Sequence, residues 1–147
     1  MNYVHIHLAI NHSPLYATLF AFFVLLIGVV RRNRTLGNAG LVITIIAALC
    51  GIAADLTGGK ASDIIDHSPP IAGVDKTLIH EHDLAASFAV TSTCIAGGVA
   101  LILFFYRRRW LEILLIVILA WSFSVVARTA LLGGRIHHPE VRPVASG

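Results

Sequence analysis

The chain of 147 residues has few charged side chains, two cysteines and one methionine, Met1. Only 13% of its residues are charged and its mean hydropathy is +0.80, so a water-soluble domain of this size could not bury its apolar surface. No Cys-x-x-Cys-His motif occurs, which excludes covalent c-type haem, and no cysteine spacing of an iron–sulfur cluster is present. The scarcity of methionine disfavours a Cu(I) site.

Four apolar runs are each near the ~20 residues that cross a bilayer as a helix, and they cover residues 14–30, 37–57, 84–106 and 111–132. The first is short unless its helix begins upstream, near Tyr3. Backbone groups in lipid must be paired internally, which favours helices. Short connections make consecutive helices antiparallel. We therefore expect an all-α integral membrane protein: one up-down four-helix transmembrane domain over residues 1–147, with an outer loop at 58–82. No strong internal repeat is evident, although the two helix–arginine–helix halves could reflect an old duplication.

Arginines follow the first and third runs in two clusters, Arg31, Arg32 and Arg34, and Arg107, Arg108 and Arg109. Basic residues in short loops remain in the cytoplasm. This predicts a protein of the inner membrane of a bacterium. Both of its termini and residues 58–82 would lie on the periplasmic side. The net charge of +3 then reports topology, and no nucleic-acid partner is expected. No basic segment precedes the first run, so a cleaved signal peptide is not expected.

With this topology every histidine falls at the periplasmic end: His5, His7, His12, His67, His80, His82, His137 and His138. Such clustering predicts a site that uses imidazoles. In the third run, helical periodicity places His82 on one face with Ala86, Ala89, Thr93 and Gly97, and His80 on the opposite face. Small residues on one face either let helices pack closely or leave room for a flat group.

Other histidines are candidates by position. Pro14 either begins the first helix or kinks a longer one, and in both cases it holds His12 at the mouth of the bundle. His5 and His7 precede it on a segment that could equally be interfacial. Gly133 and Gly134 are expected to end the fourth helix, so that His137 or His138 could reach the site.

Arg128 is unusual because it lies about one turn inside the fourth run, where charges are costly. With Trp121 and Ser124 it is expected to face the interior. It could pair with Asp55 of the second run, or with a haem propionate, since its planar fork suits carboxylates.

The pattern resembles an uncharacterised family of small bacterial membrane proteins with four spans. A His-x4-His-x-Pro motif opens the first helix of that family, as in the segment from His7 to Pro14. A histidine begins the third helix, as His82 does, and a Gly-Gly with a following histidine closes the chain. The resemblance covers nearly the whole chain and implies the bundle and the outer histidine cluster, without an activity. The long outer loop and the extra histidines depart from the family pattern.

These residues predict a membrane electron-transfer subunit with one or two b-type haems near the periplasmic face. His12 and His82 would hold one haem and His7 with His138 a second, with Ala86 and Ala89 lining the slot and Arg128 holding a propionate. Electrons would pass between quinol and a periplasmic partner such as a c-type cytochrome, within a larger membrane complex. No catalytic residue is predicted, and a carrier is favoured over a stand-alone enzyme. The alternatives are a protein that handles Cu(II) or zinc at the outer face and a cofactor-free structural or assembly subunit.

Overall fold

The computed structural model describes residues 3–68 and 75–138, and this part of the chain is helical with no strands. Its helices are α1 (Tyr3–Ile10), α2 (Ser13–Val30), α3 (Arg34–Asp66), α4 (Lys76–Phe105) and α5 (Arg109–His137). Four segments are long and apolar enough to cross a membrane, Tyr3–Val30, Arg34–Asp66, Lys76–Phe105 and Arg109–Ile136. The expectation of an all-helical protein with four helices long and apolar enough to span a membrane is confirmed.

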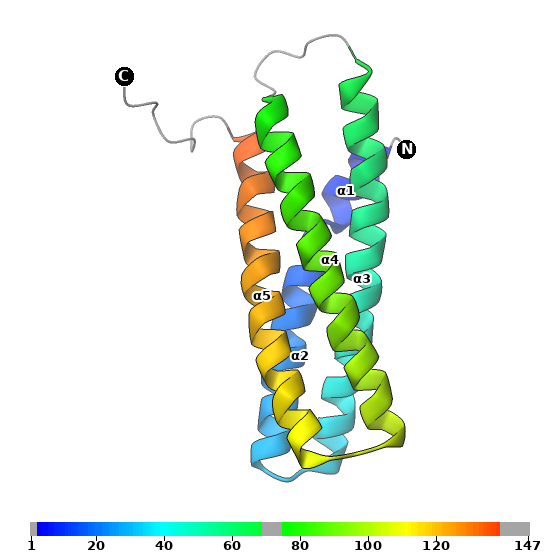
Figure 1. Cartoon of the computed structure of the whole chain (residues 1–147), viewed down its shortest axis with the longest axis vertical. Helices are drawn as coiled ribbons and strands as arrows, with labels where there is room; N and C mark the ends of the chain where they lie inside the picture. Colours follow the sequence, from blue (N-terminus) through cyan, green and yellow to red (C-terminus); the bar gives the residue numbers. More distant parts are fainter. Residues whose placement is uncertain (1–2, 69–74, 139–147) are drawn as a thin grey trace, which may run out of the picture.

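The four long helices lie side by side as a bundle, with consecutive helices pointing in opposite directions (Figure 1). Each packs on the next, α2 also packs on α5, and α1 packs on α3. The α2–α3 and α4–α5 connections, which carry the arginine clusters, lie together at one end, here called the arginine end. The described histidines belong to α1, to the start of α2 and α4 and to the end of α3 and α5, so they gather at the opposite, histidine end.

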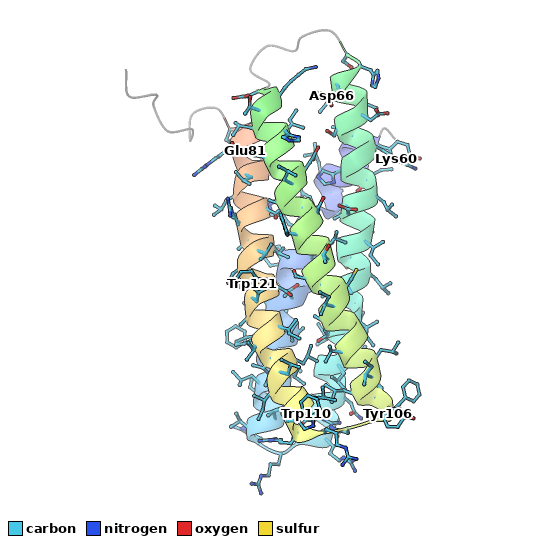
Figure 2. All side chains as sticks on the ribbon, in the orientation of Figure 1. Lys60, Asp66, Glu81, Tyr106, Trp110 and Trp121 are labelled. Atoms are coloured by element: carbon cyan, nitrogen blue, oxygen red, sulfur yellow. The ribbon has the colours of Figure 1, made fainter. Side chains whose placement is uncertain are left out.

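Large apolar side chains cover the outside of the bundle. Phe88 is 71% exposed, Phe105 77% and Leu131 69%, and no more than 33% of the most apolar stretch of each span is buried. Figure 2 shows Trp121 pointing outward midway along the bundle, and Tyr106 and Trp110 near the arginine end. A surface this apolar fits lipid rather than water, and aromatic rings near one end are typical of a membrane interface.

Small residues let the helices approach closely. A Cβ added at Gly28 of α2 would lie 2.5 Å from the backbone nitrogen of Gly37 in α3, and one at Gly40 would lie 2.7 Å from the Cα of Leu25. Leu25 is fully buried in the core, together with Leu41, Leu103, Leu115 and Leu119. Helices in lipid associate through such close packing because burial from water no longer drives them together.

Three sequence-based expectations about the histidine end are wrong. The loop expected at 58–82 is largely helical, because α3 continues to Asp66 and α4 begins at Lys76; its centre, 69–74, lies outside the described residues. The Gly133–Gly134 pair does not end α5, which continues to His137. Trp121, Ser124 and Arg128 face outward. Polarity suggested the wrong face, since α5 is apolar on all sides and buries Leu115, Leu119, Ser122 and Val126 instead.

The close approach of α2 and α3 predicts the effect of one methyl group. Gly28→Ala should lower the free energy of unfolding by about 1–3 kcal/mol, because the Cβ meets backbone that cannot rotate away. The matched control is Gly98→Ala in α4, where no atom lies within 4 Å of an added Cβ. Thermal unfolding of both variants in one detergent checks this, and equal melting temperatures would show that the packing of α2 on α3 is looser than described.

Candidate functional site

A cavity of about 230 Å³ lies inside the histidine end, between α1, α2, α3, α4 and α5. Five of the residues predicted for the site line it, namely His7, His12, His82, Ala86 and Ala89. Gly51, Gly58 and Gly133 also contribute to its wall. The predicted face of the third run is confirmed, since Ala89, Thr93 and Gly97 are buried and His82 and Ala86 are half-buried in the cavity wall.

His7 is held against α3 by a hydrogen bond and by a glycine. Its Nδ1 donates to the carbonyl oxygen of Ala54 at 3.0 Å and lies 3.4 Å from Oγ1 of Thr57. One turn further along α3, a Cβ at Gly58 would lie 3.0 Å from Cε1 of the ring. The glycine therefore leaves the space that the imidazole occupies.

His82 is held against α5 in the same way. Its Nδ1 donates to the carbonyl oxygen of Thr129 at 3.0 Å, and a Cβ at Gly133 would lie 3.2 Å from Cε1. A neutral imidazole that donates from Nδ1 carries its lone pair on Nε2. In its neutral form each histidine would therefore have the tautomer in which Nε2 can bind a metal.

The rings of His7 and His82 lie close together in the wall of the cavity, in an edge-on arrangement. Their centroids are 6.3 Å apart and their planes are inclined by 76°. Two imidazoles on opposite sides of one metal ion have centroids about 6–6.5 Å apart, because each metal–nitrogen bond is about 2 Å long. The distance between the rings of His7 and His82 is therefore compatible with both imidazoles binding one metal ion.

Each of these histidines, with the carbonyl oxygen that it hydrogen-bonds and the glycine beside its ring, is here called a histidine seat. The two seats are related by a constant spacing along the chain. His7 and His82, Ala54 and Thr129, and Gly58 and Gly133 are each 75 residues apart. Ala54 and Thr129 differ, but the same spacing joins further pairs of identical residues, including His5 with His80, Arg32 with Arg107, Arg34 with Arg109, and Gly59 with Gly134. The first half, residues up to Asp66, and the second half, from Lys76, thus repeat one pattern, contrary to the view that no strong internal repeat exists.

This repeat corrects the expected pairing of the histidines. The sequence paired His12 with His82, whereas the counterpart of His82 is His7, and His12 corresponds to Ser87. The side chain of His12 is exposed and hydrogen-bonds Oδ1 of Asn11 at the edge of the cavity. The carbonyls and glycines that hold the rings were missed, although the 75-residue spacing could have revealed them.

Other predicted partners lie elsewhere. The side chains of Arg128 and His138 are exposed and neither residue lines the cavity. Asp55 lines the cavity wall but forms no ion pair with Arg128 among the described residues. Asp83, next to His82, accepts a hydrogen bond from Ser62 at 2.8 Å. The side chain of His137 lies outside what the structure describes.

Within the described residues, no group of three or more His, Cys, Asp or Glu side chains is arranged to hold a metal ion. Comparison with known protein families, curated proteins and solved structures finds no match. The resemblance to the small four-span family therefore stays an expectation, and the function has to be argued from the cavity.

The two glycines under the rings predict a selective effect on each histidine. Gly58→Ala should shift His7 and Gly133→Ala should shift His82, because either ring must give way by a few tenths of an ångström to the added Cβ, which weakens its bond to a carbonyl. Weakening of a hydrogen bond worth about 1 kcal/mol should speed exchange of the Nδ1 proton by up to about fivefold, measured by NMR of ¹⁵N-histidine-labelled protein.

The neighbouring glycines are matched controls. No atom lies within 4 Å of a Cβ added at Gly59 or Gly134, so Gly59→Ala and Gly134→Ala should leave both Nδ1 protons as in the parent protein. Unchanged exchange at His7 in Gly58→Ala, or at His82 in Gly133→Ala, would contradict the described seats.

Proposed function

We propose that this protein is an electron-transfer subunit of a membrane complex, which binds one b-type haem between His7 and His82. The observation that carries this proposal is the pair of imidazoles, 6.3 Å apart, each donating Nδ1–H to a backbone carbonyl. Histidines that bind metals almost always donate their other ring nitrogen in this way, which fixes both the tautomer and the ring orientation.

The small, mostly apolar lining of the cavity suits a flat ligand, but its volume is small for one. Gly51, Ala86 and Ala89 present little bulk, and the lining is mostly apolar. The enclosed volume of about 230 Å³ is below the ~300–1,000 Å³ typical of ligand sites. Because the cavity is partly open, a porphyrin held by the two rings would extend beyond it to the bundle surface.

One haem is proposed, which differs from the sequence-based prediction of up to two. His7 cannot serve a second pair with His138 if it faces His82. Arg128 is not included as a propionate partner, because its side chain points outward. His12 remains at the cavity edge, where it could influence the ligand without binding it.

The chain's own residues would set the redox properties. When bound, haem supplies a one-electron couple, and its potential depends on axial ligands, burial and nearby charge. The carbonyl oxygens of Ala54 and Thr129 would keep a proton on Nδ1 of each imidazole and fix the orientation of both rings. Asp55 and Asp83 line the same cavity, and their negative charge would favour the oxidised form.

The setting of this activity follows from the sequence. We propose the up-down topology with both termini outside, in the inner membrane of a bacterium, and the histidine end toward the periplasm. Electrons would pass between quinol and a periplasmic partner such as a c-type cytochrome. Because so little of the chain is polar, the subunit would dock within a larger complex rather than act alone.

Visible spectroscopy of the purified protein tests the proposal. A reduced-minus-oxidised spectrum should show a sharp α-band, and a pyridine haemochrome assay should give one haem per chain. His7→Ala and His82→Ala should each abolish the low-spin spectrum, because each removes one of two axial ligands.

The histidine that lies two residues before each proposed ligand provides a matched control. His5 and His80 lie two residues before the proposed ligands, are exposed and do not line the cavity, so His5→Ala and His80→Ala should keep the full α-band. His12→Ala should keep it too. A flat spectrum in the parent protein would refute the haem, and elemental analysis of the same sample would then separate a copper or zinc protein from one without a cofactor.

A further inference from the structure

A second cavity, of about 180 Å³, lies at the arginine end of the bundle. Four arginines line it, Arg32, Arg34, Arg107 and Arg109, together with Glu112. These residues come from the loops that join α2 to α3 and α4 to α5, and from the first turn of α5. The cavity therefore sits where the two arginine loops meet.

One buried carboxylate, that of Glu112, lies close to two of these arginines, Arg107 and Arg109. Glu112 is only 6% exposed; its Oε1 accepts from Nε of Arg107 at 2.6 Å, and its Oε2 lies 3.8 Å from a terminal guanidinium nitrogen of Arg109. That nitrogen of Arg109 also donates to the carbonyl oxygen of Val29 at 2.7 Å. Glu112 thus holds Arg107 at the cavity wall, and the carbonyl oxygen of Val29 holds Arg109 beside it.

The other two arginines have no such partner. Arg32 and Arg34 make no hydrogen bond or ion pair through their side chains with any residue that the structure describes. Arg32 has a φ of 51° at the turn that ends α2, a left-handed position usually taken by glycine. Four guanidinium groups, of which those of Arg32, Arg34 and Arg109 are exposed, therefore line the cavity with one carboxylate, so its net charge is positive.

The arrangement repeats between the two halves. Arg32 corresponds to Arg107 and Arg34 to Arg109 at the same 75-residue spacing that relates the histidine seats. Each half thus contributes an Arg-x-Arg pair to a cavity between them. Glu112 stands where the first half has Gly37, so the carboxylate is present once and cannot balance both pairs.

We propose that this cavity binds a phosphate-bearing anion, supplied by the headgroup of an anionic phospholipid. Arginine suits phosphate because its planar fork donates two parallel hydrogen bonds. Basic pockets between transmembrane helices on the cytoplasmic side are known to hold lipid headgroups. The apolar outer surface of the spans beside it would take the acyl chains. The proposal does not depend on the haem.

Retention of lipid by the full-length protein tests this site. The protein is reconstituted in bilayers of mixed phosphatidylglycerol and phosphatidylcholine, extracted gently, and its bound lipid is counted by native mass spectrometry. The parent should retain phosphatidylglycerol over phosphatidylcholine. Arg32→Gln and Arg34→Gln should each lower this retention about tenfold, as expected for loss of a charge-assisted hydrogen bond.

Two variants of equal charge separate a built site from general attraction. Arg31 and Arg108 lie in the same loops but do not line the cavity, so Arg31→Gln and Arg108→Gln should change retention by less than about twofold. Equal loss in all four variants, or equal retention of both lipids by the parent, would overturn the proposal. Circular dichroism confirms that each variant remains helical.

A second arm distinguishes the lipid from a free anion. Inorganic phosphate is added to delipidated protein in detergent and the melting temperature is measured. Competition between phosphate and phosphatidylglycerol, lost in Arg34→Gln, supports a headgroup phosphate in the cavity. Stabilisation by phosphate without any retained lipid assigns the same site to a free phosphate and overturns the lipid as its source.

Discussion

Close approach of helix backbones is the constraint on which the structure depends. In lipid, apolar side chains gain nothing by leaving the solvent, so helices are held by tight packing. Gly28 against Gly37 brings α2 to α3, and Gly51 against Thr93 brings α3 to α4, where a Cβ at Gly51 would lie 2.8 Å from a hydroxyl oxygen. Replacing these small residues with large ones would separate the helices and widen the spacing of everything that they carry.

At the histidine end, the same small residues serve a different purpose. Gly58 and Gly133 leave space that an imidazole fills instead of a helix backbone. A glycine inside a helix costs about 0.5–1 kcal/mol relative to alanine, and both helices continue through theirs. The ring packing and the hydrogen bond that each glycine permits compensate for part of this loss. Each of the two histidines is therefore held at a position where a glycine weakens the neighbouring helix.

The sequence predicts the membrane fold well because hydropathy and length alone determine the number of spans. It predicts the site only in part. His82 and the face carrying Ala86 and Ala89 follow from helical periodicity, but the partner of His82 depends on where α1 lies, which periodicity within one helix cannot give. A polar residue in an apolar helix is expected to face the interior of the bundle, but the side chain of Arg128 is exposed. The 75-residue repeat relates distant segments of the sequence, and it identifies His7 as the counterpart of His82 without any knowledge of how the helices pack.

Because each ring is held within its own half of the repeat, the distance between the two rings depends on how the halves pack together. His7 is held by α3 of its own half and His82 by α5 of its own half, so neither seat spans the boundary between halves. That boundary is the packing of α3 on α4 and of α2 on α5. A Cβ at Gly97 of α4 would lie 2.7 Å from the Cβ of Ala48 in α3, which leaves little freedom there. The ring separation is therefore controlled by the packing between halves, and a change in that packing would alter the geometry of a ligand bound by both rings while leaving each histidine in its own seat.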